Sequence, residues 1–353
     1  MAQSFEGIAT EGSVFFVGDI HLYDKEMAST KGYLKSNQVM LDNLYNYILD
    51  NSHIKLVIFE GDLQHKTPIK IKEIHKWRTW FRKLGQLLAQ RHLESGWDVI
   101  VHHREELADI EVEGAYPIYS LRGNHDSEVS NRSNKDFTFF DELLHEGLIQ
   151  NPRGLTINDS VYIDCRNYGE AHVFPDPELT YNRQVVGVFH DTIYHQDSPQ
   201  FIHLLREVTP DACYDGHEVF KGLDIAIAGH IHSQAPMAQV ETEVGSTTYL
   251  QTGSMARTSF GGDNVRDVGY CAELQLSNLE LTPIELDILP VDEFFNLQRI
   301  ANRNRDTPSY DDFNLSMEDV EDTTYSVEEA IRAMEGVLPS VKEVALNLLQ
   351  DES

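Results

Sequence analysis

The chain has 353 residues, 41% of them hydrophobic, which is enough for one large globular domain with an appendage. No apolar run approaches the length of a membrane span, and the polar stretch from Met1 to Gly12 lacks a signal-peptide pattern, so we expect an intracellular, cytoplasmic protein with no membrane partner. Cys165, Cys213 and Cys271 have no CxxC spacing, which argues against a disulfide framework or a zinc knuckle and predicts buried thiols.

The formal net charge of −30 argues against a protein that coats DNA nonspecifically, because DNA-binding surfaces present Lys and Arg to the phosphates. The charge is uneven, however. Between His65 and His92 there are eight Lys and Arg residues against the single acid Glu73. Bound dications would also offset carboxylates locally. Composition therefore leaves room for a focused DNA or partner contact, with a solvated helix face as the alternative for the basic run.

The first half of the chain alternates short apolar runs with helical patterns, as α/β proteins do. Buried strands are predicted at residues 13–17, 56–60 and 116–121, and helices at about 39–49 and 69–93. The helical spacing of Trp77, Trp80 and Phe81 favours core packing, with stacking on unpaired bases as the alternative. Residues 97–114 are expected to form an insertion with its own strand.

Strand patterns dominate the chain after Asn151. They are predicted at residues 161–165, 185–190, 223–228, 247–251, 269–276 and 281–289. These patterns indicate a second sheet packed on the first, because each sheet must bury its apolar face against another layer.

The C-terminal region has a different composition, with 13 acids and two bases in residues 306–353. We divide the chain into a domain at residues 1–290, an acidic linker at 291–325 and a helix-loop-helix tail at 326–353. Ser326 and Glu329 form a capping box at the start of the first tail helix, and Pro339 separates it from a second amphipathic stretch. We expect this tail to be a possible partner-binding element.

Five short strings at or beyond the predicted strand ends carry the chemistry. They are Gly18-Asp19-Ile20-His21, Gly61-Asp62, Gly123-Asn124-His125-Asp126, His190 and Gly229-His230-Ile231-His232. Their metal-ligand side chains are Asp19, His21, Asp62, Asn124, His190, His230 and His232, which leaves His125 for catalysis. Two cations held roughly 4 Å apart can clamp the attacking and the leaving oxygen of a phosphate ester. We therefore expect phosphoester hydrolysis.

In this order the strings resemble the calcineurin-like metallophosphoesterases, whose pattern is D-x-H, G-D, G-N-H-D, H and G-H-x-H, over about residues 13–255. The resemblance implies an α/β fold, a four-layer αββα sandwich of two mixed sheets. It assigns Asp19, His21 and His232 to one metal, Asn124, His190 and His230 to the other, and Asp62 as the bridge. Mixed imidazole and carboxylate ligands favour transition metals over calcium. By resemblance we expect two manganese ions, with magnesium, iron or zinc as alternatives.

The resemblance leaves His125 free to protonate the departing oxygen or to stabilise the charge that develops on phosphorus. Asp126 is expected to orient His125 through an Asp-to-His hydrogen bond. The alternative is that Asp126 only caps the turn that follows.

Gly61-Asp62-Leu63-Gln64-His65, followed by Pro68, is similar to the G-D-L-F-H-x-x-x-P signature of SbcD-like (meiotic-recombination-eleven-like) DNA nucleases. Gln64 stands where Phe is usual, and Pro68 is one residue closer. The resemblance implies that His65 contacts the DNA phosphate, and we expect Lys66 and Arg122 to be further substrate contacts. An ordinary loop role is the alternative for His65.

Two further segments resemble the same nucleases. Gln251-Thr252-Gly253-Ser254 with Arg257-Thr258-Ser259 is similar to their Q-P-G-S-x-x-x-T-S stretch, and the tail resembles the helices that bind the coiled coil of an SbcC-like ATPase. The predicted function is a DNA exonuclease or endonuclease in repair, recombination or replication, with that ATPase partner and a possible homodimer. The alternatives are a phosphatase or phosphodiesterase acting on nucleotides, other small phosphoesters or phosphoproteins, and a non-catalytic interaction subunit.

Overall fold

The computed structural model describes residues 11–26, 30–65, 69–104, 114–126, 138–172, 175–208, 213–258, 265–298 and 300. The chain divides into two units, Met1–Phe295 and Asn296–Ser353, and almost everything described belongs to the first. The expected tail and most of the expected linker lie outside the described residues, as do Lys66, Pro68 and Ser259.

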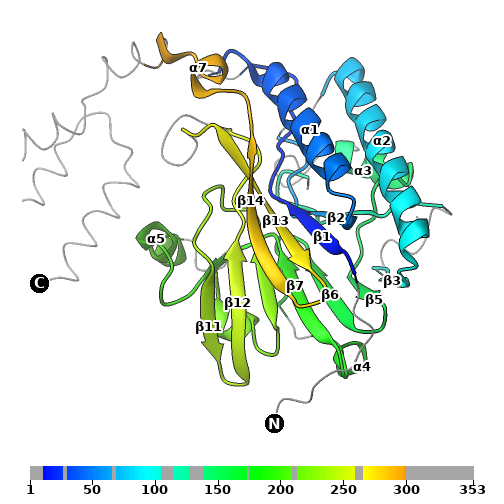
Figure 1. The fold of residues 1–353 in the computed structure, drawn as a ribbon. Helices are drawn as coiled ribbons and strands as arrows, with labels where there is room; N and C mark the ends of the chain where they lie inside the picture. Colours follow the sequence, from blue (N-terminus) through cyan, green and yellow to red (C-terminus); the bar gives the residue numbers. More distant parts are fainter. Residues whose placement is uncertain are drawn as a thin grey trace, which may run out of the picture. The chain divides into compact units, whose positions relative to one another are not determined.

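The first unit contains two large mixed sheets (Figure 1). The first sheet has the order β14-β13-β1-β2-β4. Its strands are β1 (Ser13–Val17), β2 (Ile54–Phe59), β4 (Ile118–Ser120), β13 (Val268–Gln275) and β14 (Glu280–Asp287). The strands β1, β2 and β4 run parallel, whereas β13 and β14 are antiparallel to their neighbours.

The second sheet has the order β11-β12-β10-β7-β6-β5-β3. Its strands are β3 (Val99–His102), β5 (Gly154–Ile157), β6 (Val161–Arg166), β7 (Gln184–Phe189), β10 (Ile225–Ala228), β11 (Ala238–Thr242) and β12 (Gly245–Gln251). The strand expected inside the 97–114 insertion is β3, which pairs with β5 at one edge of this sheet. A small separate sheet pairs β8 (Thr192–Tyr194) with β9 (Cys213–Asp215).

Helices cover the outer faces of both large sheets. The helices are α1 (Tyr33–Asp50), α2 (Ile71–Ser95), α3 (Phe139–His145), α4 (Pro177–Thr180), α5 (Gln200–Val208), α6 (Gly216–Val219) and α7 (Val291–Phe294). Figure 1 shows α1 and α2 side by side on one face of the first sheet. The helix α7 belongs to the first unit, so the linker expected from residue 291 begins with an ordered turn of helix.

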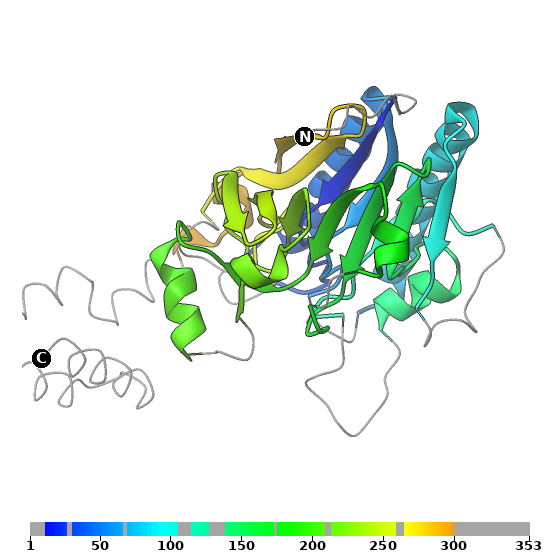
Figure 2. The same cartoon turned by 90° about the horizontal axis from the view of Figure 1, so that it is seen from below.

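The alternation of side chains along β1 explains the layers. Phe15 and Val17 pack with α1 and α2, whereas Val14 and Phe16 pack against the second sheet. Because both faces of β1 are covered, the whole strand is apolar and buried. Figure 2 shows the two sheets as adjacent layers. Since α4 and α6 contribute to the cluster on the far face of the second sheet, the αββα order is confirmed.

The predicted core of α2 is also confirmed. Trp77, Trp80 and Phe81 are buried, and the Trp80 indole N–H donates to the Leu41 carbonyl of α1, so these rings do not stack on bases. The helix ends at Gly96 in the left-handed conformation that favours glycine. Several of its cations have partners within the protein: Lys76 with Glu73, Arg78 and Arg82 with Glu146, Lys83 with the Tyr45 ring, and Arg91 with carbonyls at the end of α1.

The parallel strands bring the motifs together. β1, β2 and β4 end directly before the loops of the first three motifs, and β7 and β10 end directly before the loops of the last two. The carboxyl ends of parallel strands share one edge of a sheet, where α/β proteins place their sites. The three cysteines are buried and free, as predicted. No helix among the described residues has both the length and the apolar composition needed to cross a membrane.

Candidate metal centre

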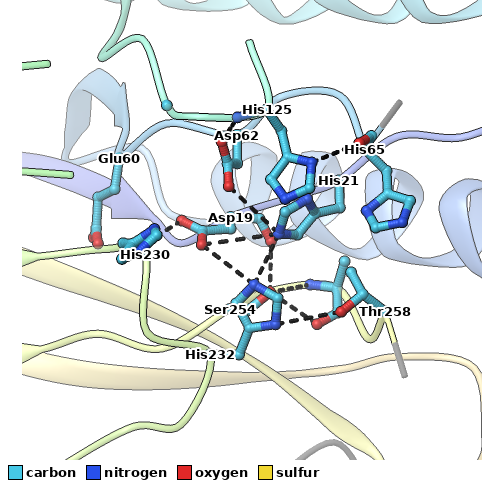
Figure 3. Close-up of polar contacts among 12 residues, drawn as sticks. Asp19, His21, Glu60, Asp62, His65, His125, His230, His232, Ser254 and Thr258 are labelled. Carbon is cyan, nitrogen blue, oxygen red and sulfur yellow. Dashed lines mark hydrogen bonds and ion pairs between the residues drawn. The ribbon is translucent and has the colours of Figure 1, made fainter. Parts of the chain in front are cut away.

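The first ligand group consists of Asp19, His21 and His232, whose ligand atoms all lie within 4.8 Å of one another. The Nε2 atoms of the two imidazoles are 2.8 Å apart. Asp19 Oδ2 lies 3.9 Å from His21 Nε2 and 3.7 Å from His232 Nε2. As Figure 3 shows, the three side chains converge from separate loops, as the family resemblance implied.

The second ligand group consists of Asp62, His190 and His230, also within 4.8 Å of one another. Asn124 joins them, since its Oδ1 lies 3.1 Å from His230 Nδ1 and 3.3 Å from His190 Nε2. The His190 Nδ1–H donates to the Glu60 carbonyl at 2.7 Å. That hydrogen bond fixes the ring and leaves Nε2 facing the other ligands, as is usual for a metal-bound histidine.

Asp62 connects the two groups through a single oxygen. Its Oδ2 lies 3.7 Å from His21 Nε2 and 3.4 Å from His190 Nε2. Its Oδ1 instead accepts the backbone N–H of His125 at 2.8 Å. Asp62 is therefore the residue that would be shared between the two groups, with Oδ2 near an imidazole of each and Oδ1 held by the backbone.

Three ligands have a strained backbone. His21, Asp62 and His230 have φ values of 40°, 48° and 76°, in the left-handed region that non-glycine residues rarely adopt. Such conformations cost on the order of 1–3 kcal/mol each and are kept where the surrounding structure enforces them. Here the His21 N–H donates to the Asp62 carbonyl at 2.9 Å, which ties the first two motif loops together.

The motif glycines make room for the ligands. At Gly61, with φ of 120°, a Cβ atom would lie 2.3 Å from His190 Nδ1. At Gly123 it would lie 2.1 Å from Asp62 Oδ1. Any side chain at either position would displace a ligand directly.

Burial keeps most of the imidazoles neutral. It lowers the pKa of His230 to about 3 and that of His232 to about 4, and it holds the pKa of His21 well below its usual range. Burial also raises the pKa of Asp19 to about 7. The three histidines are thus in the neutral form that binds metal, whereas Asp19 must lose its proton.

Asp62 and His190 form the charged pair of the site. Burial works against both charges, but the attraction of His190 and His21 holds the pKa of Asp62 well below its usual range. In the same way, Asp62 and Asp19 overcome burial and raise the pKa of His190 to about 10. In the metal-free protein the proton on His190 therefore stands in for part of the positive charge that a cation would bring.

The donor set fits a pair of divalent transition-metal ions. Asp19 Oδ2 is buried and has no hydrogen-bond partner among the described residues. An unsatisfied buried polar atom costs about 1–3 kcal/mol, which a bound cation would remove. Converging imidazole nitrogens and carboxylate oxygens are ligands that manganese, iron and zinc accept. The two groups, sharing Asp62, would hold one ion each.

His125 and His65 lie beside the first group. The His125 Nδ1–H donates to the His65 carbonyl at 2.6 Å. The two rings are stacked, with centroids 5.2 Å apart, and the His21 ring lies 4.9 Å from that of His125. Figure 3 shows both rings at the rim of the ligand cluster. The structure thus brings both predicted residues to the metal centre.

Asp126 does not orient His125. Its buried carboxylate accepts backbone N–H groups of Leu63, Gln64 and Gly123. The expected Asp-to-His hydrogen bond is therefore wrong, because the His65 carbonyl takes the His125 proton and the carboxylate joins two motif loops. Burial, with the nearby Asp62 charge, raises the pKa of Asp126 to about 7.

Of the other predicted substrate contacts, the structure describes only Arg122. The Arg122 guanidinium pairs with Asp141 of α3 at 2.5 Å and lies over the Phe140 ring. Lys66 is outside the described residues. The Gly253 segment, in contrast, supports the first group: Ser254 Oγ donates to the Asp19 carbonyl at 2.8 Å, and Thr258 Oγ1 lies 3.4 Å from His232 Nδ1.

Three residues of the site were not predicted from the sequence. The buried Tyr33 hydroxyl donates to the His21 carbonyl at 3.0 Å. Glu60 is buried near Asp19 and His190, and burial raises its pKa to about 8. Tyr168 packs against two ligand rings. Only Glu60 carried a sequence signal, since it directly precedes Gly61-Asp62 at the end of a buried strand.

The comparisons with known proteins agree with this geometry. The family model described as calcineurin-like phosphoesterase matches residues 12–234, which is well over half of the chain. No curated protein matches the chain. The match ends just after His232, so it includes all seven predicted ligands. The chain therefore belongs to the calcineurin-like phosphoesterase family, with the Asp and His clusters of a metal-dependent phosphoester hydrolase.

Proposed function

We propose that this phosphoesterase is a manganese-dependent DNA nuclease, acting as an exonuclease or endonuclease in repair, recombination or replication. The observation that carries the proposal is the position of His65, whose ring stacks on His125 at the edge of the ligand cluster. A phosphoesterase for small substrates needs no additional phosphate-binding side chain beside the metals. A nuclease gains from one, because the DNA strand continues on both sides of the scissile bond.

The ligand groups would hold the ions as described: Asp19, His21 and His232 for one, Asn124, His190 and His230 for the other, with Asp62 shared. When bound, two divalent ions supply positive charge that activates water at neutral pH and neutralises the phosphate.

The hydrogen bonds of His125 determine which of its atoms exchanges a proton. A carbonyl oxygen only accepts, so the contact with the His65 carbonyl places a proton on His125 Nδ1. Nε2 is then the atom that exchanges a proton with the substrate: once the ring has taken up a second proton there, it can give that proton to the departing oxygen and return to the neutral form with Nδ1 still protonated. The His65 backbone would thus orient the catalytic ring, and the proposal assigns the DNA phosphate contact to the His65 imidazole stacked on it.

A direct experiment compares two substrates with the manganese-loaded full chain: a linear duplex with labelled ends and bis-para-nitrophenyl phosphate. We expect cleavage of both. The variant His65→Ala should lose roughly 10-fold in kcat/KM on the duplex and less than half of its activity on the small ester, the loss corresponding to one phosphate contact.

His53→Ala is the matched control, because His53 is half exposed and pairs with Glu273 rather than with the site. Equal losses on both substrates would make His65 a general member of the site. A duplex that survives while the small ester is cleaved would contradict the nuclease proposal.

The net charge of −30 favours the second candidate, a phosphatase or phosphodiesterase acting on nucleotides or other small phosphoesters, because such substrates need no extended basic surface. The same two-substrate assay separates this candidate from the nuclease.

We further propose an SbcC-like coiled-coil ATPase as the partner of residues 326–353. The amphipathic pattern and capping box of that segment support the proposal. Capture of such an ATPase by the full chain, and not by a chain ending at residue 302, is the expected result. Equal capture by both chains would contradict it.

A further inference from the structure

A loop between β6 and α4, which none of the five motifs contains, is fixed to the second ligand group. The backbone N–H of Tyr168 donates to the Arg122 carbonyl at 2.9 Å. In return, the Arg122 N–H donates to Asn167 Oδ1 at 2.8 Å. This pair of hydrogen bonds joins the Tyr168 loop to the segment that leads into Asn124.

The same loop is held from its other side. The N–H of Gly169 donates to Asp191 Oδ1 at 3.3 Å, and Asp191 directly follows the ligand His190. Gly169 has a φ of 72°, which lets the chain turn back at this point. Tyr168 is therefore held between two loops that each carry a ligand of the second group.

The Tyr168 ring packs against ligands of that group. Its centroid lies 5.3 Å from the His230 ring, tilted by 44°, and 6.2 Å from the His190 ring, at 71°. His65 and His125 contact the His21 ring of the first group instead. Polar aromatic side chains thus flank both ligand groups: His65 and His125 lie at the first group and Tyr168 lies at the second.

The hydroxyl of Tyr168 has no hydrogen-bond partner within the described part of the chain, and the side chain is partly exposed. A phenol has an ordinary pKa of about 10 and can donate a hydrogen bond through its O–H. Its ring is already packed on imidazoles, so the O–H is the group left to meet a substrate.

We propose that Tyr168 is a catalytic residue whose phenol O–H donates a hydrogen bond to a non-bridging oxygen of the scissile phosphate at the second ligand group. The inference rests on the proposed phosphoester hydrolysis and adds a residue to that site. A neutral donor beside the cations would stabilise charge that increases on the phosphate oxygens as the ester is cleaved.

The test is Tyr168→Phe, which keeps the ring packing and removes only the hydroxyl. With manganese, kcat/KM should fall roughly 10- to 100-fold on both the end-labelled duplex and bis-para-nitrophenyl phosphate, because both contain the scissile phosphate. Metal content and melting temperature should stay those of the wild type. Tyr181→Phe is the matched control, since Tyr181 is 75% exposed and follows α4.

A second readout needs no turnover. Inorganic phosphate should bind the manganese-loaded Tyr168→Phe protein roughly 10-fold more weakly than the wild type in calorimetry. If the wild-type protein cleaves the small ester but not the duplex, the nuclease proposal is contradicted. The Tyr168→Phe variant can still be compared with the wild type on the small ester and by phosphate binding.

Three results would overturn the proposal. Activity and phosphate affinity within twofold of the wild type would show that the hydroxyl makes no contact. A loss accompanied by loss of metal would show a purely structural role. A loss confined to the duplex would place the hydroxyl on another part of the DNA.

Discussion

The two halves of the metal centre differ in how they are prepared for a cation. In the first half, burial keeps His21 and His232 neutral, and only Asp19 has to lose a proton near neutral pH. In the second half, His190 holds a proton up to a pKa of about 10 because Asp62 and Asp19 stabilise its charge. A metal ligand must be deprotonated, so the second ion must displace the proton on His190. The histidines of the first half carry no such proton.

The contacts that hold the ligands in place also differ between the two halves. The first half is fixed by Tyr33, Ser254 and Thr258, which contact the backbone or ring of its ligands. The second half is fixed by ring packing of Tyr168 and by the Glu60 carbonyl. The first half is thus held by side-chain hydroxyl groups, and the second by a packed aromatic ring and a backbone carbonyl.

The largest effect should come from removing the charge that both halves share. Asp62→Asn keeps the shape but lacks the anionic oxygen between His21 and His190. We expect kcat to fall at least roughly 1,000-fold, as for other essential site residues, and the metal content per chain to fall below two. Kinetics and elemental analysis would measure both. Retention of two tightly bound ions would show that Asp62 is not the bridge.

His125→Ala should come next, since this residue serves catalysis without holding a metal. Loss of the proton donor predicts a fall in kcat of roughly 100- to 10,000-fold. The metal content should remain that of the wild type, because His125 belongs to neither half. Loss of an ion in this variant would mean that the role assigned here is wrong.

The pH dependence of metal binding should separate the halves. Above pH 8 Asp19 is ionised, so the first ion should bind with little further dependence on pH. The second ion must displace the His190 proton, so its affinity should rise up to roughly tenfold per pH unit until pH approaches 10. Calorimetry in buffers of different ionisation enthalpy would count the protons released. If the affinities of both ions changed with pH in the same way, the two halves would not differ in how they are protonated.

The smallest effect is expected from Tyr33→Phe, which removes one buried hydrogen bond to the His21 carbonyl. The free energy of unfolding should fall by about 1 kcal/mol, measured by urea denaturation of the metal-free protein. Affinity for the first ion should weaken, and affinity for the second should not change. A lower affinity for both ions would show that the two halves are mechanically coupled.

The side chains that cluster in the structure could be named from the sequence because each is contained in a short string whose chemistry is local. Asp19, Asp62 and His190 follow buried strands, so their position was set once the strands were recognised. The motif glycines are explained by the same local geometry, as Gly61 shows. The order of layers was implied by the family resemblance, and β1, which is buried on both of its faces, agrees with it.

The supporting contacts could not be predicted because they join segments far apart in the chain. Nothing near Asp126 indicates that its carboxylate accepts N–H groups from the Asp62 loop, or that His125 pairs with a carbonyl sixty positions earlier. Short strands such as β5 and β11 lack a clear periodicity. The start of α3 was not predicted, although Thr138 and Asp141 form a capping box there.

The most direct test of the account is to count and characterise the ions in the full-length protein after loading with manganese. Two ions per chain, with the spin coupling in paramagnetic resonance that a shared carboxylate oxygen produces, is the predicted result. A single ion, or two ions without magnetic coupling, would contradict a centre built around Asp62.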